Sequence, residues 1–446
     1  MILKIKNITS DRPVKRHPFR QIVFCLLAIV TVLSGSTTAY GSNYDYNNIS
    51  VGFKNEVETN AAATSRSSFS YPPLSETAEV YLITCGAGSD FYTTFGHTAI
   101  RICDSAYILY GKPQPIDIVF NYGTFDFNTP HFYYQFAKGR LSYFLSLEQF
   151  DDFVEGYRWE GRAVYTQKLE LTQAEKQRLY ELLMENWQPK NRYYRYDFFL
   201  DNCATRVRDM IEKSLEDRFF YTERNATPLK SYRQLLHPYM ERKMEWWKFG
   251  IDLVLGMRCD RKITRFDEAF LPFALMRQTD TLRLSGSDKP LAHKAQQILD
   301  ERPDELADSF PPLWLFSLIA LFYLLLTLME IKQKRSLSVA NAADTVLFAS
   351  VGLLSLPLLF LWFLSDHYST QWNLNLLWAN PLLLWLAFRV RKAPLWLLRA
   401  VFYCSAIGLL CAALQWPQAL PVAAVPLIFT LMLRTAIKIS RKNTIK

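Results

Sequence analysis

Residues 196–206 read Tyr-Asp-Phe-Phe-Leu-Asp-Asn-Cys-Ala-Thr-Arg and lead into a predicted helix over residues 203–216. Asp201 or Asn202 can cap this helix, which places Cys203 in its first turn. The unpaired backbone N–H groups of a first turn and the positive end of the helix dipole both favour a thiolate over a thiol. This stretch therefore predicts a nucleophilic cysteine at the start of a helix.

A cysteine nucleophile needs a base, and His97 is the predicted one. It precedes a predicted strand over residues 98–103 and directly follows a glycine, so its ring can face an open site. A third polar group has to orient the imidazole. Asn121, on a predicted strand over residues 116–122, is our candidate for that role, and Asp126 is the alternative.

The polar segment around these residues is predicted to be α+β. Residues 78–84 and 163–171 have the β-branched and aromatic content of further strands. A Thr-Gln-Ala-Glu capping box at residues 172–175 opens an amphipathic helix over residues 172–186. No two cysteines or histidines of the segment have metal-ligand spacing, and a serine elbow and a phosphate-binding glycine loop are both missing. We therefore expect neither a metal nor a cofactor.

Four cysteines of this segment leave two interpretations open. An even number in an oxidising compartment is typical of two disulfides, and Cys85 with Cys103 is one such pairing. Cys259 is a third member of the set. The setting of Cys203, the fourth, indicates catalysis instead.

The C-terminal part of the chain is strongly apolar and predicts a membrane domain. Each of its apolar stretches is close to the ~20 residues that a helix needs to cross a bilayer. We predict five transmembrane helices within residues 311–433, over residues 311–329, 345–364, 372–388, 395–414 and 417–433.

The positive charge of the chain follows this membrane pattern. The net charge is +9, yet four short segments together hold +15, which leaves −6 for the rest; these segments are residues 1–20, 330–335, 389–392 and 434–446. Basic residues that flank apolar stretches indicate cytoplasmic loops, whereas a nucleic-acid-binding protein would carry them on its polar domain. We therefore expect a cytoplasmic C-terminus and no nucleic-acid partner.

The N-terminus has the pattern of an export signal. Residues 1–39 combine a basic region, an apolar run and small residues up to a cleavage site near Ala39; a retained anchor is the alternative. Residues 40–75 are rich in Ser, Thr and Asn and predict a flexible leader. A catalytic domain over residues 76–310 and a basic cytoplasmic tail over residues 434–446 complete the predicted domains.

The order of histidine strand, asparagine strand and cysteine helix resembles a circularly permuted papain-like (NlpC-type) domain of the lecithin:retinol acyltransferase class. Four blocks resemble the Lnb-type lipoprotein N-acyltransferase family of Bacteroides. They are Leu-Ile-Thr-Cys-Gly at residues 82–86, Phe-Gly-His-Thr-Ala at 95–99, Asn-Tyr-Gly-Thr-Phe-Asp at 121–126 and Asp-Asn-Cys-Ala-Thr-Arg at 201–206.

This resemblance implies an enzyme of the inner membrane whose catalytic domain lies in the periplasm. Cys203 would take an acyl chain from a glycerophospholipid as a thioester, with His97 as its base. The α-amine of the N-terminal S-diacylglyceryl cysteine of an exported lipoprotein would then accept the chain. The membrane, the phospholipid and the diacylated lipoprotein are the expected partners, and the residues expected to contact substrate are Arg206, Asn202, Arg140 and Tyr122.

Arg140 in particular is a candidate contact for a lipid phosphate. Residues 241–256 pair basic and aromatic residues with an apolar run, as an interfacial helix does, although an ordinary buried helix would read the same way. Two other functions stay open. One is a papain-like envelope hydrolase, either a cell-wall amidase or peptidase or a phospholipase, and the other is a non-catalytic membrane sensor.

Overall fold

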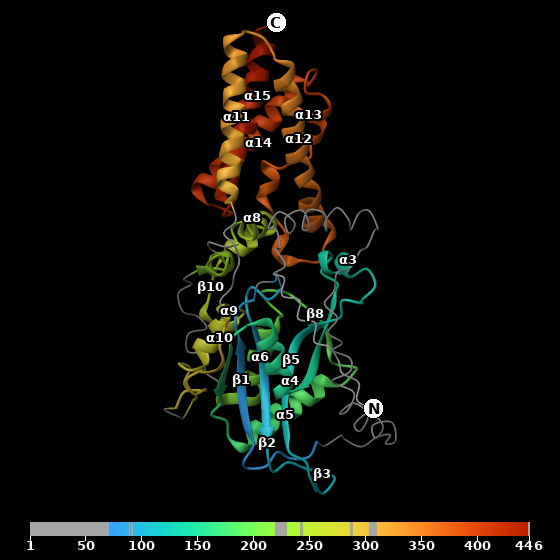
Figure 1. The fold of residues 1–446 in the computed structure, drawn as a ribbon, viewed down its shortest axis with the longest axis vertical. Helices are drawn as coiled ribbons and strands as arrows, with labels where there is room; N and C mark the ends of the chain where they lie inside the picture. Colours follow the sequence, from blue (N-terminus) through green and yellow to red (C-terminus); the bar gives the residue numbers. More distant parts are fainter. Residues whose placement is uncertain are drawn as a thin grey trace, which may run out of the picture. The chain divides into compact units, whose positions relative to one another are not determined.

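The computed structural model describes residues 71–88, 90, 92–218, 230–240, 244–285, 289–302 and 310–444 (Figure 1). The predicted signal over residues 1–39 and most of the predicted leader over residues 40–75 lie outside the described residues.

An antiparallel sheet of seven strands forms the centre of the N-terminal domain. Its spatial order is β11-β7-β1-β2-β5-β6-β8. The predicted strands are confirmed, and the sequence missed three others, β6, β8 and β11. The strands are β1 (Glu79–Cys85), β2 (His97–Asp104), β5 (Ile116–Phe125), β6 (Ser142–Gln149), β7 (Val164–Lys168), β8 (Tyr193–Arg195) and β11 (Gln296–Leu299).

Helices cover both faces of this sheet because successive strand residues point to opposite sides. Leu82 and Ile100 belong to the core shared with α5 (Gln173–Trp187) and α6 (Cys203–Leu215). On the opposite face, Ile83 and Ala99 pack with Phe153 of α4 (Phe150–Glu160). The predicted capping box is present at the start of α5, so the α+β class is confirmed.

Smaller elements complete the N-terminal domain. A third apolar core joins the loop before α6 to the segment over residues 230–279. These elements are β3 (Ile108–Leu109), β4 (Lys112–Pro113), α3 (Phe132–Ala137), β9 (Lys230–Ser231), α7 (Tyr232–Leu236), α8 (Glu245–Val254), η3 (Met257–Asp260), β10 (Lys262–Ile263), α9 (Arg265–Glu268) and α10 (Pro272–Thr279).

The segment predicted to be either interfacial or buried forms α8 in its described part. The rings of Trp246 and Phe249 both contact Phe316 in the first turns of the next long helix. Leu253 belongs to the core of the membrane helices. Helix α8 therefore packs against the membrane domain.

Four helices among the described residues are long and apolar enough to cross a membrane (Figure 1). They contain α11 (Pro312–Lys332), α12 (Ser338–Leu359) with its extension to Leu364, α14 (Leu395–Leu414) and α15 (Val425–Thr444). Four of the five predicted spans are therefore confirmed as long apolar helices, and the third has another form.

The third predicted span, over residues 372–388, is broken into the short turn η6 (Leu374–Leu377) and the seven-residue α13 (Leu382–Phe388). Polar side chains cause the break. Asn373 and Asn375 donate to the backbone carbonyls of Asp252, Leu253 and Val254 at the end of α8. A proline at position 381 then opens α13, because its fixed φ suits a helix start.

The basic segments of the membrane domain meet at one end of it. Arg441 donates to the carbonyl of Arg335, and Lys442 donates to the carbonyl of Ala393. The outer ends of the same helices carry the contacts to α8, where Gln418 donates to the carbonyl of Leu255 over 3.0 Å. The basic end and the end that binds the N-terminal domain are therefore opposite.

Candidate active site

Cys203 begins α6 because the loop before it is tightly folded. The carboxylate of Asp197 accepts hydrogen bonds from the backbone N–H groups of Phe199 and Leu200. The backbones of Asp197 and Asp201 also pair with each other. This loop delivers Cys203 to the first turn, where only 5% of the residue is exposed.

The sequence offered two possible caps for α6, and the structure shows that Asn202 is the cap. Its Oδ1 accepts from the N–H groups of Ala204 and Thr205 at 2.9 Å, and Thr205 Oγ1 accepts from the Asn202 N–H. Its Nδ2 donates to the carbonyls of Phe198 and Phe270. The amide is thus fully engaged within the protein, and the substrate contact expected of Asn202 stays a prediction.

The structure brings the three predicted catalytic residues together. His97 Nε2 lies 2.6 Å from Asn121 Oδ1, and His97 also hydrogen-bonds to Cys203. Because Nε2 is bonded to Asn121, Nδ1 is the nitrogen left to exchange a proton with the thiol. This arrangement is what a cysteine nucleophile with an oriented base requires.

Glu148 is a member of this network that the sequence did not indicate. Asn121 Nδ2 donates to Glu148 Oε1 over 2.7 Å, and Ser146 Oγ donates to the same oxygen over 3.3 Å. An amide that donates through Nδ2 to Glu148 must turn its Oδ1 towards His97. Burial raises the pKa of the Glu148 carboxyl even though the bonds from Asn121 and Ser146 oppose that shift.

The sequence missed Glu148 because its strand, β6, was not predicted. The register pairs Asn121 with Ser146, and Glu148 lies two residues further on the same face. A lone glutamate among the alternating apolar residues of Ser142–Gln149 was the available signal.

The surroundings of Cys203 stabilise its thiolate. Burial raises the pKa of the thiol, but the charge of His97 and hydrogen bonds from His97, the Thr98 backbone and Tyr196 outweigh burial and hold the pKa below its usual value. Burial likewise lowers the pKa of His97, and its contacts with Cys203 and Asn121 reverse that effect and raise it. The pair therefore favours thiolate with imidazolium. Thr98 and Tyr196 are further site residues that the sequence did not single out.

A β-bulge in β5 lies beside the cysteine. The pairing of β5 with β6 shifts between Tyr122 and Thr124, and Gly123 has φ = 96° there. A Cβ on Gly123 would lie 3.6 Å from Cys203 Cβ and 3.8 Å from His97 Cε1. A side chain at this position would therefore contact both catalytic residues, at a φ that side chains disfavour.

Asp126, the alternative to Asn121, does not take its place. It is exposed in the turn after β5, and its carboxylate accepts from the backbone N–H of Asn128 over 2.8 Å. The contact with His97 is made by Asn121.

Two of the other three predicted substrate residues form ion pairs within the protein. Arg206 forms a bidentate pair with Asp201 at 2.6 and 2.7 Å and lies over the ring of Tyr194. Tyr122 is fully buried, and its hydroxyl has no hydrogen-bond partner. Arg140 pairs with Asp366 at 2.7 Å. Their contacts with substrate stay predictions.

Of the two interpretations of the cysteines, the one with two disulfides is wrong, because all six described cysteines are free. The register places Cys85 opposite His97 and Cys103 opposite Glu79, at the two ends of the same strand pair. Cys259 donates to the Ser369 carbonyl. Burial raises the pKa of Cys85 and of Cys259 to about 12 in each case, so these thiols are poor nucleophiles.

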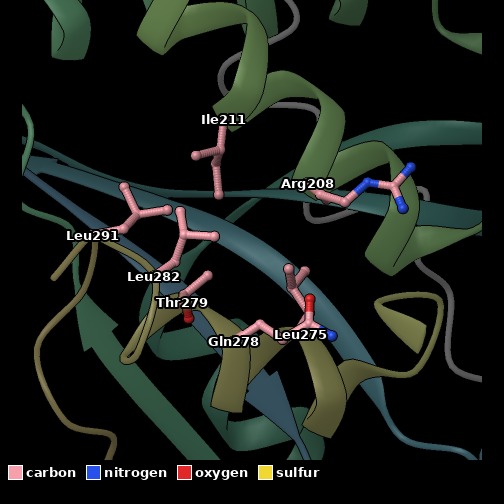
Figure 2. Close-up of a pocket in the computed structure, with 7 residues that line it drawn as sticks. All are labelled: Arg208, Ile211, Leu275, Gln278, Thr279, Leu282 and Leu291. Atoms are coloured by element: carbon pink, nitrogen blue, oxygen red, sulfur yellow. The ribbon is translucent and has the colours of Figure 1, made fainter. Parts of the chain in front are cut away.

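Two cavities of the N-terminal domain lie away from this site. Figure 2 shows one of about 10 Å³, room for about one water, lined by residues such as Arg208 of α6 and Leu275 of α10. A larger one of about 310 Å³ lies over α9 and α10. Neither is lined by Cys203, His97 or Asn121. No group of three metal-ligand side chains occurs within the described parts of the chain.

Comparison with protein families gives a match for each half of the chain, and both matches are Lnb domains. Residues 74–238 match the model of the Lnb N-terminal periplasmic domain, and residues 304–444 match the model of the Lnb transmembrane domain.

The chain belongs to the Lnb family.

The first Lnb match contains Cys203, His97, Asn121 and Glu148, and the second contains all four long helices. This Lnb-family chain is therefore an inner-membrane protein with a periplasmic domain. The searches of curated proteins and of solved structures returned no match.

Proposed function

We propose that this Lnb-family protein is a lipoprotein N-acyltransferase with a thioester intermediate. The observation that carries the proposal is the contact of Cys203, His97 and Asn121 at a helix start, in a domain that is fastened to membrane helices. Both substrates, a glycerophospholipid and a diacylated lipoprotein, are held in the membrane. A soluble cell-wall peptide would not require such a membrane domain.

The first half-reaction loads the acyl chain. The Cys203 thiolate attacks an ester carbonyl carbon of the phospholipid, so that an S–C bond forms and the C–O ester bond breaks. The leaving alkoxide takes the proton of the His97 imidazolium and departs as a lysophospholipid alcohol. The Thr98 N–H and the Tyr196 hydroxyl both bond to the sulfur and so stabilise the attacking thiolate.

The second half-reaction passes the chain to the lipoprotein. The neutral α-amine of the S-diacylglyceryl cysteine attacks the thioester, so that an N–C bond forms and the C–S bond breaks. Neutral His97 takes the amine proton, which restores imidazolium beside thiolate. The reaction needs no cofactor, because the nucleophile, base and orienting groups are all side chains.

The charges of the membrane domain support an orientation with the C-terminus in the cytoplasm. The positive-inside rule favours the cytoplasm for its basic end, and the N-terminal domain then lies in the periplasm. Helices α12 and α14 then both start at the cytoplasmic side, so the broken segment over residues 372–388 returns the chain across the membrane. This route keeps five crossings with four long helices.

The test is expression in a strain that lacks its own lipoprotein N-acylation, followed by mass spectrometry of a reporter lipoprotein's N-terminal peptide. We expect the wild type to add one amide-linked acyl chain and Cys203→Ala to add none. Cys103→Ala is the matched control and should retain the activity, because Cys103 lies at the far end of β1 and β2.

Two outcomes would contradict the proposal. Acylation that persists in Cys203→Ala would move the reaction to another residue. Release of free fatty acid without acylation of the reporter would make the protein a phospholipase that uses the same thioester.

A further inference from the structure

Helix α3 (Phe132–Ala137) has an unusual surface. Four of its six residues are aromatic, and none of the six is buried. Tyr133 is 54% exposed and Phe136 is 41% exposed, and Phe127 just before the helix is 59% exposed. Water solvates a cluster of large rings poorly, so such a patch usually marks a binding surface.

A row of ring contacts joins this patch to Cys203. Tyr196, whose hydroxyl bonds to the Cys203 sulfur, stacks on Tyr143 with ring centres 4.5 Å apart. Tyr143 contacts Phe125 at 5.3 Å, and Phe125 contacts Phe127 at 5.0 Å. Phe127 in turn contacts Phe132 of α3, also at 5.0 Å. The row is continuous from the sulfur to the exposed helix.

Helix α3 also contacts the C-terminal end of the membrane helix α12 and the residues that follow it. The ring of Tyr134 lies 6.5 Å from that of Phe360. His367 Nε2 lies 2.9 Å from the Phe136 carbonyl, and Asp366 N–H donates to the Lys138 carbonyl over 2.9 Å. The aromatic patch is therefore tied to a segment that leads directly into the bilayer.

Two arginine side chains lie near the contact between α3 and α12. Arg140 and Arg195 share a single carboxylate, that of Asp366, at 2.7 and 3.5 Å. Two guanidinium groups with one carboxylate leave a surplus positive charge, and the side chain of Arg195 is 72% exposed. A phosphate group is the natural partner of such a surplus.

We propose that the aromatic row from α3 to Tyr196 is the path along which the acyl chain of the phospholipid reaches Cys203, with the lipid phosphate held near Arg140 and Arg195. This inference rests on the proposed function. The occupant is the chain of the phospholipid rather than of the lipoprotein, because the row ends at the sulfur that receives the acyl group. Rings and acyl methylenes would shield each other from water.

The experiment uses the full chain in proteoliposomes of phosphatidylethanolamine. Intact-protein mass spectrometry measures the thioester on Cys203 without lipoprotein, and a diacylated lipopeptide then measures transfer. The same thioester is also measured with p-nitrophenyl butyrate, a short and soluble acyl donor. The variant is Phe127→Ser with Tyr133→Ser, and the matched control is Tyr110→Ser, an exposed tyrosine on the distant β3–β4 hairpin.

We expect the double variant to lower the ratio of the phosphatidylethanolamine rate to the butyrate rate by about tenfold, because the loss of a few buried methylene contacts has that effect. Tyr110→Ser should leave both rates unchanged. Phosphatidylethanolamine with a photoreactive acyl chain should cross-link to the peptide that contains residues 125–136.

Several results would overturn the path. An unchanged ratio, or cross-links confined to other peptides, would exclude it. A normal thioester with impaired transfer would assign the aromatic row to the chains of the lipoprotein. A wild type that forms the thioester from phosphatidylethanolamine and never transfers it would instead refute the proposed function and leave the path standing.

Discussion

At the residue scale, four side chains from four separate elements form one line of hydrogen bonds. Cys203 on α6 meets His97 on β2, His97 meets Asn121 on β5, and Asn121 meets Glu148 on β6. Each bond fixes the rotation of the next group. The last two therefore determine which nitrogen of His97 faces the thiol.

The first prediction concerns the reactivity of Cys203 with pH. The pKa of its thiol lies below the usual value, so alkylation by iodoacetamide should start to rise at a pH below that of a free thiol. His97→Ala removes the positive partner and should move the rise to higher pH. Mass spectrometry of the Cys203 peptide over a pH series measures both curves. Identical curves for the two proteins would contradict the ion pair.

The second prediction concerns Glu148. Glu148→Ala frees the Asn121 amide to rotate, so turnover should fall by roughly tenfold to a hundredfold, as misplaced catalytic groups commonly cause. Glu148→Gln keeps an oxygen that can accept from Asn121 Nδ2 and should recover most of the activity. The rise in Cys203 alkylation should move to higher pH in Glu148→Ala and stay in place in Glu148→Gln. Equal loss in both variants would assign Glu148 a role that depends on its acid group.

At the element scale, irregularities in regular structure shape the site. Helix α6 starts where a tight loop and an asparagine cap place Cys203 in its first turn. Strand β5 bulges at Gly123, where a side chain would contact both Cys203 and His97. Bulges commonly redirect side chains next to active sites.

The third prediction concerns this bulge. Gly123→Ala places a methyl group in van der Waals distance of Cys203, His97 and Tyr196, at a φ of 96° that alanine disfavours. Turnover should fall by about tenfold or more, because the strained backbone at this φ has to shift and so misplaces the neighbouring thiol and base. Circular dichroism should remain that of the folded protein. Full activity in Gly123→Ala would show that the geometry of the site does not depend on glycine at this bulge.

At the scale of the whole molecule, the periplasmic and membrane halves meet through polar contacts to backbone groups. Gly256 N–H donates to the Ser369 carbonyl at 2.8 Å, and Met257 N–H donates to the Trp372 carbonyl at 3.1 Å. A Cβ on Gly256 would lie 1.8 Å from the Gln371 carbonyl oxygen, so only glycine permits this approach. Inside the membrane half, Arg434 of α15 joins three helices, because it forms ion pairs with both Glu330 of α11 and Asp344 of α12.

The fourth prediction uses two glycines close together in the sequence. Gly256→Ala should lower the midpoint of thermal unfolding of the protein in detergent, because overpacking costs about 1–3 kcal/mol. Gly250→Ala is the matched control, since a Cβ at that helical position meets nothing within 4 Å. It should leave the midpoint unchanged or raise it slightly. Equal midpoints would contradict the proposed close approach.

Features that depend on neighbouring residues could be predicted from the sequence. The cysteine at a helix start, the capping box of α5, the central strands and four of the membrane helices each follow from neighbouring residues. Asn121 was also the sequence-based candidate for the contact with His97, with Asp126 as the alternative.

Features that depend on contacts between residues distant in sequence became visible only in the folded structure. Glu148 joins the site through the register of β6, which no local pattern specifies. The register likewise separates Cys85 from Cys103 by the length of a strand. The stretch over residues 372–388 is apolar enough to read as a helix, yet Asn375 bonds to carbonyls more than a hundred residues away. Partners distant in sequence override local preference in each of these cases, because a buried polar group must be satisfied wherever its partner lies.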